Sequence, residues 1–352
     1  MLKGDATKRP SAAPDDRLRA LPKAELHVHL DGSLRPATMA ELARERGVAL
    51  PTYDPEALGT HMLVSDAHSL EEYLSRFVLT LSVMQDAASL ERIAYELAAD
   101  HAEENVRYVE VRFCPALNTR GGLSSHEVMD ATLAGLERAE RAFPIRTRVI
   151  VCALRTLEPA ISVEMAELAV AYRDRGAVAF DLAGAEAGNP VQDHLAAFDV
   201  ARQAGLPRTV HAGEGFGAPS IHQAVHLAGA ARIGHGTRLF EDPELEDWIR
   251  GHEIPLEVCV TSNVQTGVAP TYRQHPVRRY RDEGIPVVLC TDNRLMSGVS
   301  VTDEYAHARD YLGFTWDDLV QVARTGFQSA FVDDAEKSEL LAAFEAEAAD
   351  LS

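Results

Sequence analysis

Apolar residues along the chain fall into eight short runs rich in valine and isoleucine, separated by longer stretches with a different spacing. The short runs are almost continuously hydrophobic, which is typical of parallel strands covered on both faces. We expect strands at residues 24–31, 106–114, 147–154, 177–184, 208–214, 232–239, 256–263 and 286–292. The longer stretches have apolar residues three and four positions apart and predict helices, among them 90–103, 126–142, 163–173, 192–204, 220–227 and 243–250.

Strands that alternate with helices over 352 residues predict one (β/α)8 barrel, a TIM barrel. The alternative is a doubly wound sheet, but the G-x-G-x-x-G that would follow its first strand is missing. The long link after the first strand predicts an inserted helical segment, which either packs into the core or forms a lid over the barrel mouth. Its apolar stripe follows a capping-box-like start at Ser69 and Glu72 and comprises Leu70, Leu74, Phe77 and Leu81. Residues 315–352 predict two or three extra C-terminal helices.

The first 20 residues are polar and lack the apolar centre of a signal peptide. We expect residues 1–20 to be a disordered leader, residues 21–352 to form a single domain, and the protein to stay in the cytosol. No run of ~18 apolar residues predicts a membrane helix. The four widely spaced cysteines are expected to be free buried thiols rather than disulfides or metal ligands: Cys114, Cys152, Cys259 and Cys290.

Lys and Arg total 34 against 54 Asp and Glu, which gives a net charge of −20. Such an acidic chain repels phosphate backbones, and its densest basic run, residues 278–281, is short. We therefore expect no nucleic-acid partner.

Polar residues stand at the ends of several predicted strands, which converge at one mouth in a barrel. His27 and His29 are two apart on the first strand and so face the same way, while His211 ends the fifth and Asp292 the eighth. Three imidazoles and one carboxylate are a good ligand set for Zn²⁺, although they also suit Fe²⁺ or Co²⁺. The fourth strand ends without a lysine that could bridge two metals, which favours one ion.

Two further groups belong to this predicted mouth. Glu214 lies three residues beyond His211 and can transfer a proton if burial raises its pKa, and His235 ends the sixth strand, where it can contact a metal-bound water. These residues predict metal-assisted hydrolysis or hydrolytic deamination. Ser262 and Asn263 are as consistent with lining the pocket as with tying loops together. His222 and His226 fit a surface helix better than a metal site, and His275 with Pro276 predicts a helix start.

The sequence resembles the adenosine deaminase family of metal-dependent barrel hydrolases. The shared motifs follow one another in the family's order: LPKAELHVHLDGSL, VRYVEVRFCP, FDLAGAE, VHAGE, RIGHGTRL, LEVCVTSN and TDN. The resemblance implies deamination of adenosine and deoxyadenosine to inosine and ammonia by a zinc-activated hydroxide, in purine salvage. It makes Glu214 the proton donor to the purine ring and His235 the residue that orients the hydroxide. The implied zinc ligands are His27, His29, His211 and Asp292, and the implied substrate contacts are His29, Asp31, Gly184 and Asn293.

The chain departs from the family pattern at two positions. Asn293 stands where the family usually has a second acid, and its NH₂ group can donate to a purine ring nitrogen without first being protonated. Ala185 replaces a common aspartate. The alternatives keep the chemistry but change the substrate to adenine, a methylated adenine nucleotide or aminodeoxyfutalosine. An alternative of another class is a catalytically silent binding relative, which the filled key positions disfavour.

Overall fold

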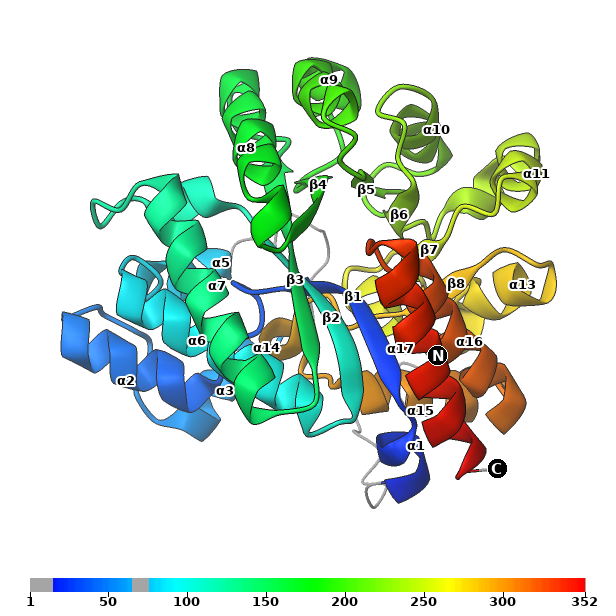
Figure 1. Ribbon diagram of the computed structural model, residues 1–352, viewed down its shortest axis with the longest axis horizontal. Helices are drawn as coiled ribbons and strands as arrows, with labels where there is room; N and C mark the ends of the chain where they lie inside the picture. The colour runs from blue at the N-terminus through cyan, green and yellow to red at the C-terminus, as the bar shows by residue number, and fades with distance from the viewer. Residues whose placement is uncertain (1–14, 65–75, 352) are drawn as a thin grey trace, which may run out of the picture.

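The described part of the chain has eight parallel strands at its centre, with helices around them (Figure 1). The computed structural model describes residues 15–64 and 76–351. The strands are β1 Lys23–His29, β2 Val106–Phe113, β3 Arg146–Leu154, β4 Ala177–Ala183, β5 Thr209–Ala212, β6 Arg232–His235, β7 Leu256–Val258 and β8 Val287–Leu289.

The strands form two four-stranded sheets in sequence order, β1-β2-β3-β4 and β5-β6-β7-β8. Isolated parallel bridges join the sheet edges, Phe180 with Arg208 between β4 and β5, and Val28 with Asp292 between β1 and β8. This sequential order with edges joined is the arrangement of a (β/α)8 barrel. It confirms the predicted fold class, because a doubly wound sheet would reverse its strand order partway through.

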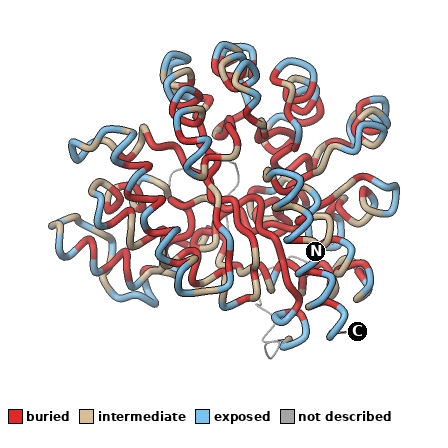
Figure 2. The backbone as a smooth tube through the Cα atoms, viewed as in Figure 1, coloured by how far each residue is buried: buried red, intermediate tan, exposed pale blue. Residues whose placement is uncertain are grey.

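Helices follow the strands and cover them from outside, with their buried faces turned inward (Figure 2). Within the described residues the α-helices are α1 Asp16–Ala20, α2 Pro36–Arg46, α3 Pro55–Met62, α5 Phe77–Ser82, α6 Ala87–Ala102, α7 Ser125–Ala142, α8 Pro159–Ala171, α9 Leu195–Gln203, α10 Ala218–His226, α11 Pro243–Gly251, α12 Val260–Gln265, α13 Val277–Asp282, α14 Arg294–Ser297, α15 Val301–Leu312, α16 Trp316–Ser329 and α17 Asp334–Ala349. Short 3-10 turns lie at η1 Pro115–Asn118, η2 Arg173–Arg175, η3 Val191–His194, η4 Leu239–Glu241 and η5 Tyr272–Gln274. None of the helices in this part of the chain is long and apolar enough to cross a membrane.

The region between β1 and β2 contains α2, α3, α5 and α6, so the predicted helical insertion is present. Phe77 and Leu81 lie on α5, where Leu81 is buried and Phe77 packs partly buried against the core. The rest of the predicted stripe and its capping box, residues 69–74, lies outside the described residues. The predicted C-terminal helices are α16 and α17.

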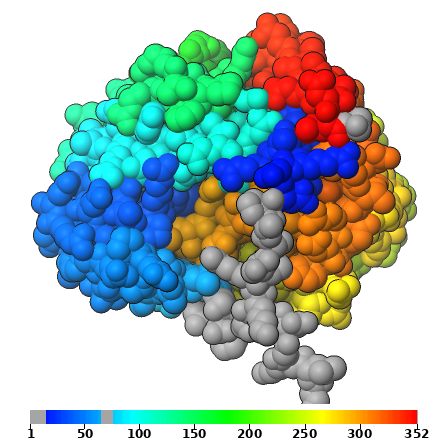
Figure 3. All heavy atoms as spheres, turned by 90° about the horizontal axis from the view of Figure 1, so that it is seen from below, coloured from blue at the N-terminus to red at the C-terminus, as the bar shows by residue number. Residues whose placement is uncertain are grey.

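The predicted leader does not extend to residue 20. Asp15 caps α1 by accepting a hydrogen bond from the Leu18 N–H at 3.1 Å, and Leu18 is fully buried. The guanidinium of Arg17 donates to the carbonyl of Leu351 at 2.7 Å, so α1 lies beside the C-terminal segment (Figure 3). The cap, the buried leucine, the ion pair of Asp15 with Arg309 and the stacking of Arg17 on Trp316 together hold this short helix. Residues 1–14 lie outside the described part.

The apolar run predicted as a seventh strand through residue 263 is only partly a strand. β7 ends at Val258 and α12 begins at Val260. The carboxylate of Glu304 accepts hydrogen bonds from the N–H groups of Val260 and Thr261 at 3.1 and 3.0 Å. This distant side chain satisfies the first backbone donors of the helix, an interaction that periodicity cannot reveal.

Candidate functional site

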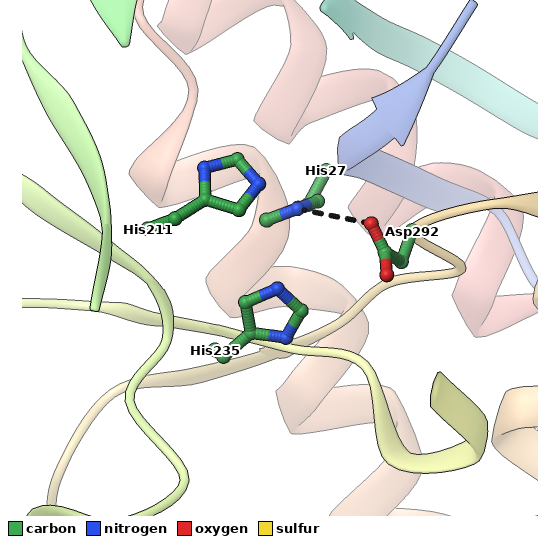
Figure 4. Close-up of side chains that lie close together, drawn as sticks. All are labelled: His27, His211, His235 and Asp292. Atoms are coloured by element: carbon green, nitrogen blue, oxygen red, sulfur yellow. Dashed lines mark ion pairs between the residues drawn. The ribbon is translucent and has the colours of Figure 1, made fainter. Parts of the chain in front are cut away.

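Four side chains from opposite sides of the barrel converge where their strands end (Figure 4). Each offers one metal-ligand atom, and these atoms all lie within 4.8 Å of one another: His27, His211, His235 and Asp292. The backbone brings the first and last strands together here, because the Asp292 N–H donates to the His27 carbonyl at 2.8 Å. All four residues are buried.

His29 also reaches this cluster. Its Nε2 lies 3.1 Å from Nε2 of His211 and 3.4 Å from Oδ1 of Asp292. The structure therefore brings the four predicted zinc ligands together and places the predicted catalytic His235 among them.

The backbone at two of these residues is strained. His235 and Asp292 have φ values of 64° and 61°, in the left-handed region that non-glycine residues seldom adopt. Strained residues of this kind gather at functional sites, where the surrounding structure holds them in place. The adjacent Gly234 allows the close packing, because a Cβ there would lie 3.0 Å from Cε1 of His27 and 3.2 Å from Cα of His211.

Carboxylates stand behind two of the histidines. Nδ1 of His27 lies 3.0 Å from Oε2 of Glu257, and Nδ1 of His211 lies 3.0 Å from Oδ2 of Asp181. Each imidazole thus donates from Nδ1 and turns the lone pair of Nε2 toward the cluster, as metal-binding histidines commonly do. Arg112 bridges the two carboxylates from below, at 3.1 Å from Asp181 and 2.7 Å from Glu257.

Burial sets the charge of the cluster. Burial lowers the pKa of His29 and His235 well below the usual value and lowers that of His211, so these imidazoles are neutral near pH 7. Burial alone would raise the pKa of Asp292, but the neighbouring His27, His235 and His29 hold it below its usual value. Burial alone would lower the pKa of His27, but the neighbouring carboxylates of Asp292 and Glu257 raise it above its usual value. A divalent metal would bind the neutral form of the imidazoles and the charged form of Asp292.

Glu214 faces this cluster from the loop after β5. Its Oε2 lies 3.5 Å from Nε2 of His235, and the residue is 4% exposed. Glu186 positions the loop, because its carboxylate accepts hydrogen bonds from the N–H groups of Gly213, Glu214 and Gly215 at 3.0 to 3.1 Å. The predicted proton donor is therefore carried on a fixed backbone.

Two predicted substrate contacts have buried oxygens without a hydrogen-bond partner among the described residues, Oδ1 of Asp31 and Oδ1 of Asn293. Burial raises the pKa of Asp31 to about 7. Gly32, which follows β1, packs closely against the side chain of Asn293. A Cβ atom on residue 32 would lie 1.7 Å from Oδ1 of Asn293 and would collide with it. Gly184 follows β4 with a φ of 93°.

Ser262 and Asn263 both contact the site. The Ser262 hydroxyl donates to Oδ2 of Asp292 at 2.7 Å, and Nδ2 of Asn263 lies 3.1 Å from Nδ1 of His235. Phe77 of α5 forms part of the wall, with its ring centroid 6.5 Å from that of His29.

Three residues that orient the site were not predicted from the sequence: Asp181, Glu186 and Glu257. A signal was available for two of them, since Asp181 and Glu257 are acids inside otherwise apolar predicted strands. Interior acids on strands covered on both faces need buried partners. Their pairing with Arg112, which also stands inside a strand, supplies those partners.

Comparison with known proteins places this geometry in context. The family profile described as Adenosine deaminase matches residues 22–346. An adenosine deaminase of Mycobacteroides abscessus is 44% identical over 329 residues, which cover 88% of this chain and 90% of that protein. A probable adenosine deaminase of Dictyostelium discoideum is 41% identical over 319 residues, and the chain spans 41% of its length.

Solved structures show the same fold. The adenine deaminase of Arthrobacter aurescens has a TM-score of 0.86 and 27% identity, and the alignment covers 92% of this chain and 98% of that one. An amidohydrolase of Burkhoderia ambifaria, described with bound Zn, has a TM-score of 0.85 and 27% identity over 99% of this chain and 97% of that one.

Proposed function

This chain belongs to the adenosine deaminase family, and from this premise we propose that it deaminates adenosine and deoxyadenosine hydrolytically, in purine salvage. The observation that carries the proposal is the juxtaposition of Glu214 with a buried cluster of histidines and Asp292. This arrangement places a group that can hold a proton beside groups that can bind a metal. Hydrolytic removal of an amino group from a purine requires both.

The cluster fits one zinc ion. Nε2 of His27 is buried and lies 3.4 Å from Oδ1 of Asp292, and three imidazoles with one carboxylate suit Zn²⁺. We propose His27, His29, His211 and Asp292 as the ligands. A bound zinc ion would lower the pKa of a water molecule to about 7 and thereby supply a nucleophile at neutral pH.

The chain's own residues would orient the reactants. Glu214 donates a proton to the purine nitrogen next to the amino-bearing carbon, and His235 forms a hydrogen bond with the attacking water oxygen. Asn293 donates from its amide to a nitrogen of the imidazole ring, and the Gly184 N–H to another ring nitrogen. The buried walls around these groups exclude bulk water, which strengthens each interaction.

Asp31 supports a nucleoside rather than a free base. Its buried Oδ1 lacks a hydrogen-bond partner in the described structure, and a ribose hydroxyl would supply the missing donor. The adenine deaminase of Arthrobacter aurescens shares the fold at lower identity, so adenine remains the alternative to test.

The test measures ammonia release by the zinc-loaded protein from adenosine, deoxyadenosine, adenine, a methylated adenine nucleotide and aminodeoxyfutalosine. We expect the two nucleosides to give the largest kcat/KM, and Asp31→Ala to reduce activity on adenosine more than on adenine. Glu214→Gln keeps the shape of the side chain but removes the proton, so kcat should fall by about 10²- to 10⁴-fold with zinc content unchanged. A preference for another purine, or near-normal kcat in Glu214→Gln, would overturn the proposal.

A further inference from the structure

His235 differs from the other buried histidines of the site in the group that faces its Nδ1 atom. Nδ1 of His235 lies 3.1 Å from the side-chain nitrogen Nδ2 of Asn263. An amide nitrogen only donates hydrogen bonds, so Nδ1 of His235 must accept. This conclusion depends on which end of the Asn263 amide faces His235.

His275 determines that orientation. The backbone N–H of Val277 donates to Nδ1 of His275 at 3.2 Å, so Nδ1 of His275 is an acceptor. Burial lowers the pKa of His275 to about 3, which keeps the ring neutral with its proton on Nε2. Nε2 then donates to Oδ1 of Asn263 at 3.1 Å, and a flipped amide would place two donors against each other.

The opposite edge of His235 agrees with this assignment. Its Nε2 lies 3.5 Å from Oε2 of Glu214, and the charged form of this carboxylate is an acceptor. The hydroxyl of Thr237 donates to the same Oδ1 of Asn263 at 2.6 Å, so that oxygen accepts twice. The contacts of Val277, His275, Thr237 and Glu214 therefore all favour the tautomer of His235 that has its proton on Nε2.

We propose that Asn263, oriented by His275, is a positioning residue that holds His235 with its proton on Nε2. The inference rests on the proposed function and deepens it. In this tautomer Nε2 has no lone pair for a metal, so His235 is not a ligand although its ring lies within the cluster. Its Nε2–H instead donates a hydrogen bond to the attacking oxygen. The proton that leaves the water goes to the carboxylate of Glu214, which then passes it to the purine nitrogen.

Asn263→Asp tests this assignment with an almost unchanged shape. Its carboxylate still accepts from His275 and Thr237, but its second oxygen now accepts from His235 and draws the proton to Nδ1. We expect kcat to fall on the order of 10²-fold or more with KM little changed, because a donor to the transition state is lost. Zinc content should stay at one per chain.

Long-range ¹H–¹⁵N NMR of zinc-loaded, ¹⁵N-histidine-labelled protein reads the tautomer without any turnover, with the His235 signal assigned by its absence in His235→Ala. The wild type should show Nε2 protonated and Asn263→Asp should show Nδ1 protonated. Thr237→Val is the matched control: it removes a donor to the same oxygen, but His275 still orients the amide, so the tautomer should not change. His275→Gln, whose amide can still donate, should retain the wild-type tautomer better than His275→Leu.

A wild-type His235 protonated on Nδ1 would overturn the inference, whether or not the protein deaminates purines. The converse result separates the two proposals. If the tautomer is as expected but none of the purines releases ammonia, the proposed function fails and the hydrogen-bond assignment stands.

Discussion

Two histidines of the site, His27 and His211, differ from a third, His235, in the group that lies behind the ring. Carboxylates of Glu257 and Asp181 lie 3.0 Å from Nδ1 of His27 and His211, whereas an amide nitrogen of Asn263 lies 3.1 Å from Nδ1 of His235. An acceptor behind the ring leaves the lone pair of Nε2 pointing inward, while a donor behind it leaves a proton there. The same side chain is thus prepared either to bind a metal or to donate a hydrogen bond.

The largest expected effect comes from removing the carboxylate in the centre of the cluster. Asp292→Ala deletes the one acidic group among the converging ligand atoms, so zinc binding and activity should be lost together, with kcat/KM falling on the order of 10³-fold or more. Metal analysis of the purified variant and ammonia release provide the two measurements. Full zinc occupancy in this variant would show that Asp292 is not a zinc ligand.

The next effect comes from placing an amide behind a ligand histidine, the reverse of Asn263→Asp. In Asp181→Asn, Arg112 and Cys152 should retain Oδ2 as the oxygen, since both contact it. The new NH₂ then replaces Oδ1, the oxygen that accepts a hydrogen bond from Nδ1 of His211 at 3.2 Å. A donor there moves the proton of His211 to Nε2 and blocks its lone pair. Zinc affinity should fall about 10- to 100-fold, as for other groups that orient metal ligands.

Cys152→Ala is the control for this substitution. It removes a neutral donor to Asp181 at 3.3 Å but leaves the negative charge behind His211. Competition with a chelator should therefore give a zinc affinity close to that of the wild type. If Asp181→Asn binds zinc as tightly as Cys152→Ala, the group behind the ring does not decide which histidine is a ligand.

The sequence predicts the features that depend on local patterns, but it does not predict those that depend on contacts between residues far apart in the chain. The alternation of apolar runs and helical spacing is local, so all eight strands were expected, and strand-end positions were enough to predict that His27, His211 and Asp292 meet. The groups behind the rings were not expected. Whether Asn263 lines the site depends on α12 beginning at Val260, which a carboxylate of Glu304 stabilises from 44 residues away.

The same limit applies to His275. Its position before a helix was predicted, and α13 does begin at Val277. Its contact with Asn263 of α12 depends on how the chain between α12 and α13 folds back, and neither spacing nor composition indicates that distance. Glu186 was visible only as one letter of the FDLAGAE motif, although its carboxylate holds three N–H groups of the Glu214 loop.

The smallest expected effect concerns Glu186, which contacts the backbone of the Glu214 loop rather than a histidine ring. In Glu186→Gln one oxygen becomes an NH₂ group that faces N–H donors, so the loop from Gly213 to Gly215 should shift. Misplacing a catalytic group by about 1 Å can reduce the rate by up to ~10²-fold, and we expect kcat to fall about tenfold here. The proposed zinc ligands keep their own partners, so zinc affinity should change little.

Glu241→Gln is the matched control, because Glu241 also accepts a backbone N–H, that of Ala218 at 3.4 Å, but outside the Glu214 loop. Its kcat should stay near that of the wild type. If both variants lose the same activity, the effect reflects general loosening of the β5–α10 segment rather than the position of Glu214. If Glu186→Gln instead loses zinc as Asp181→Asn does, the Glu214 loop also supports metal binding. The proposed division between groups that bind zinc and groups that transfer protons would then be wrong.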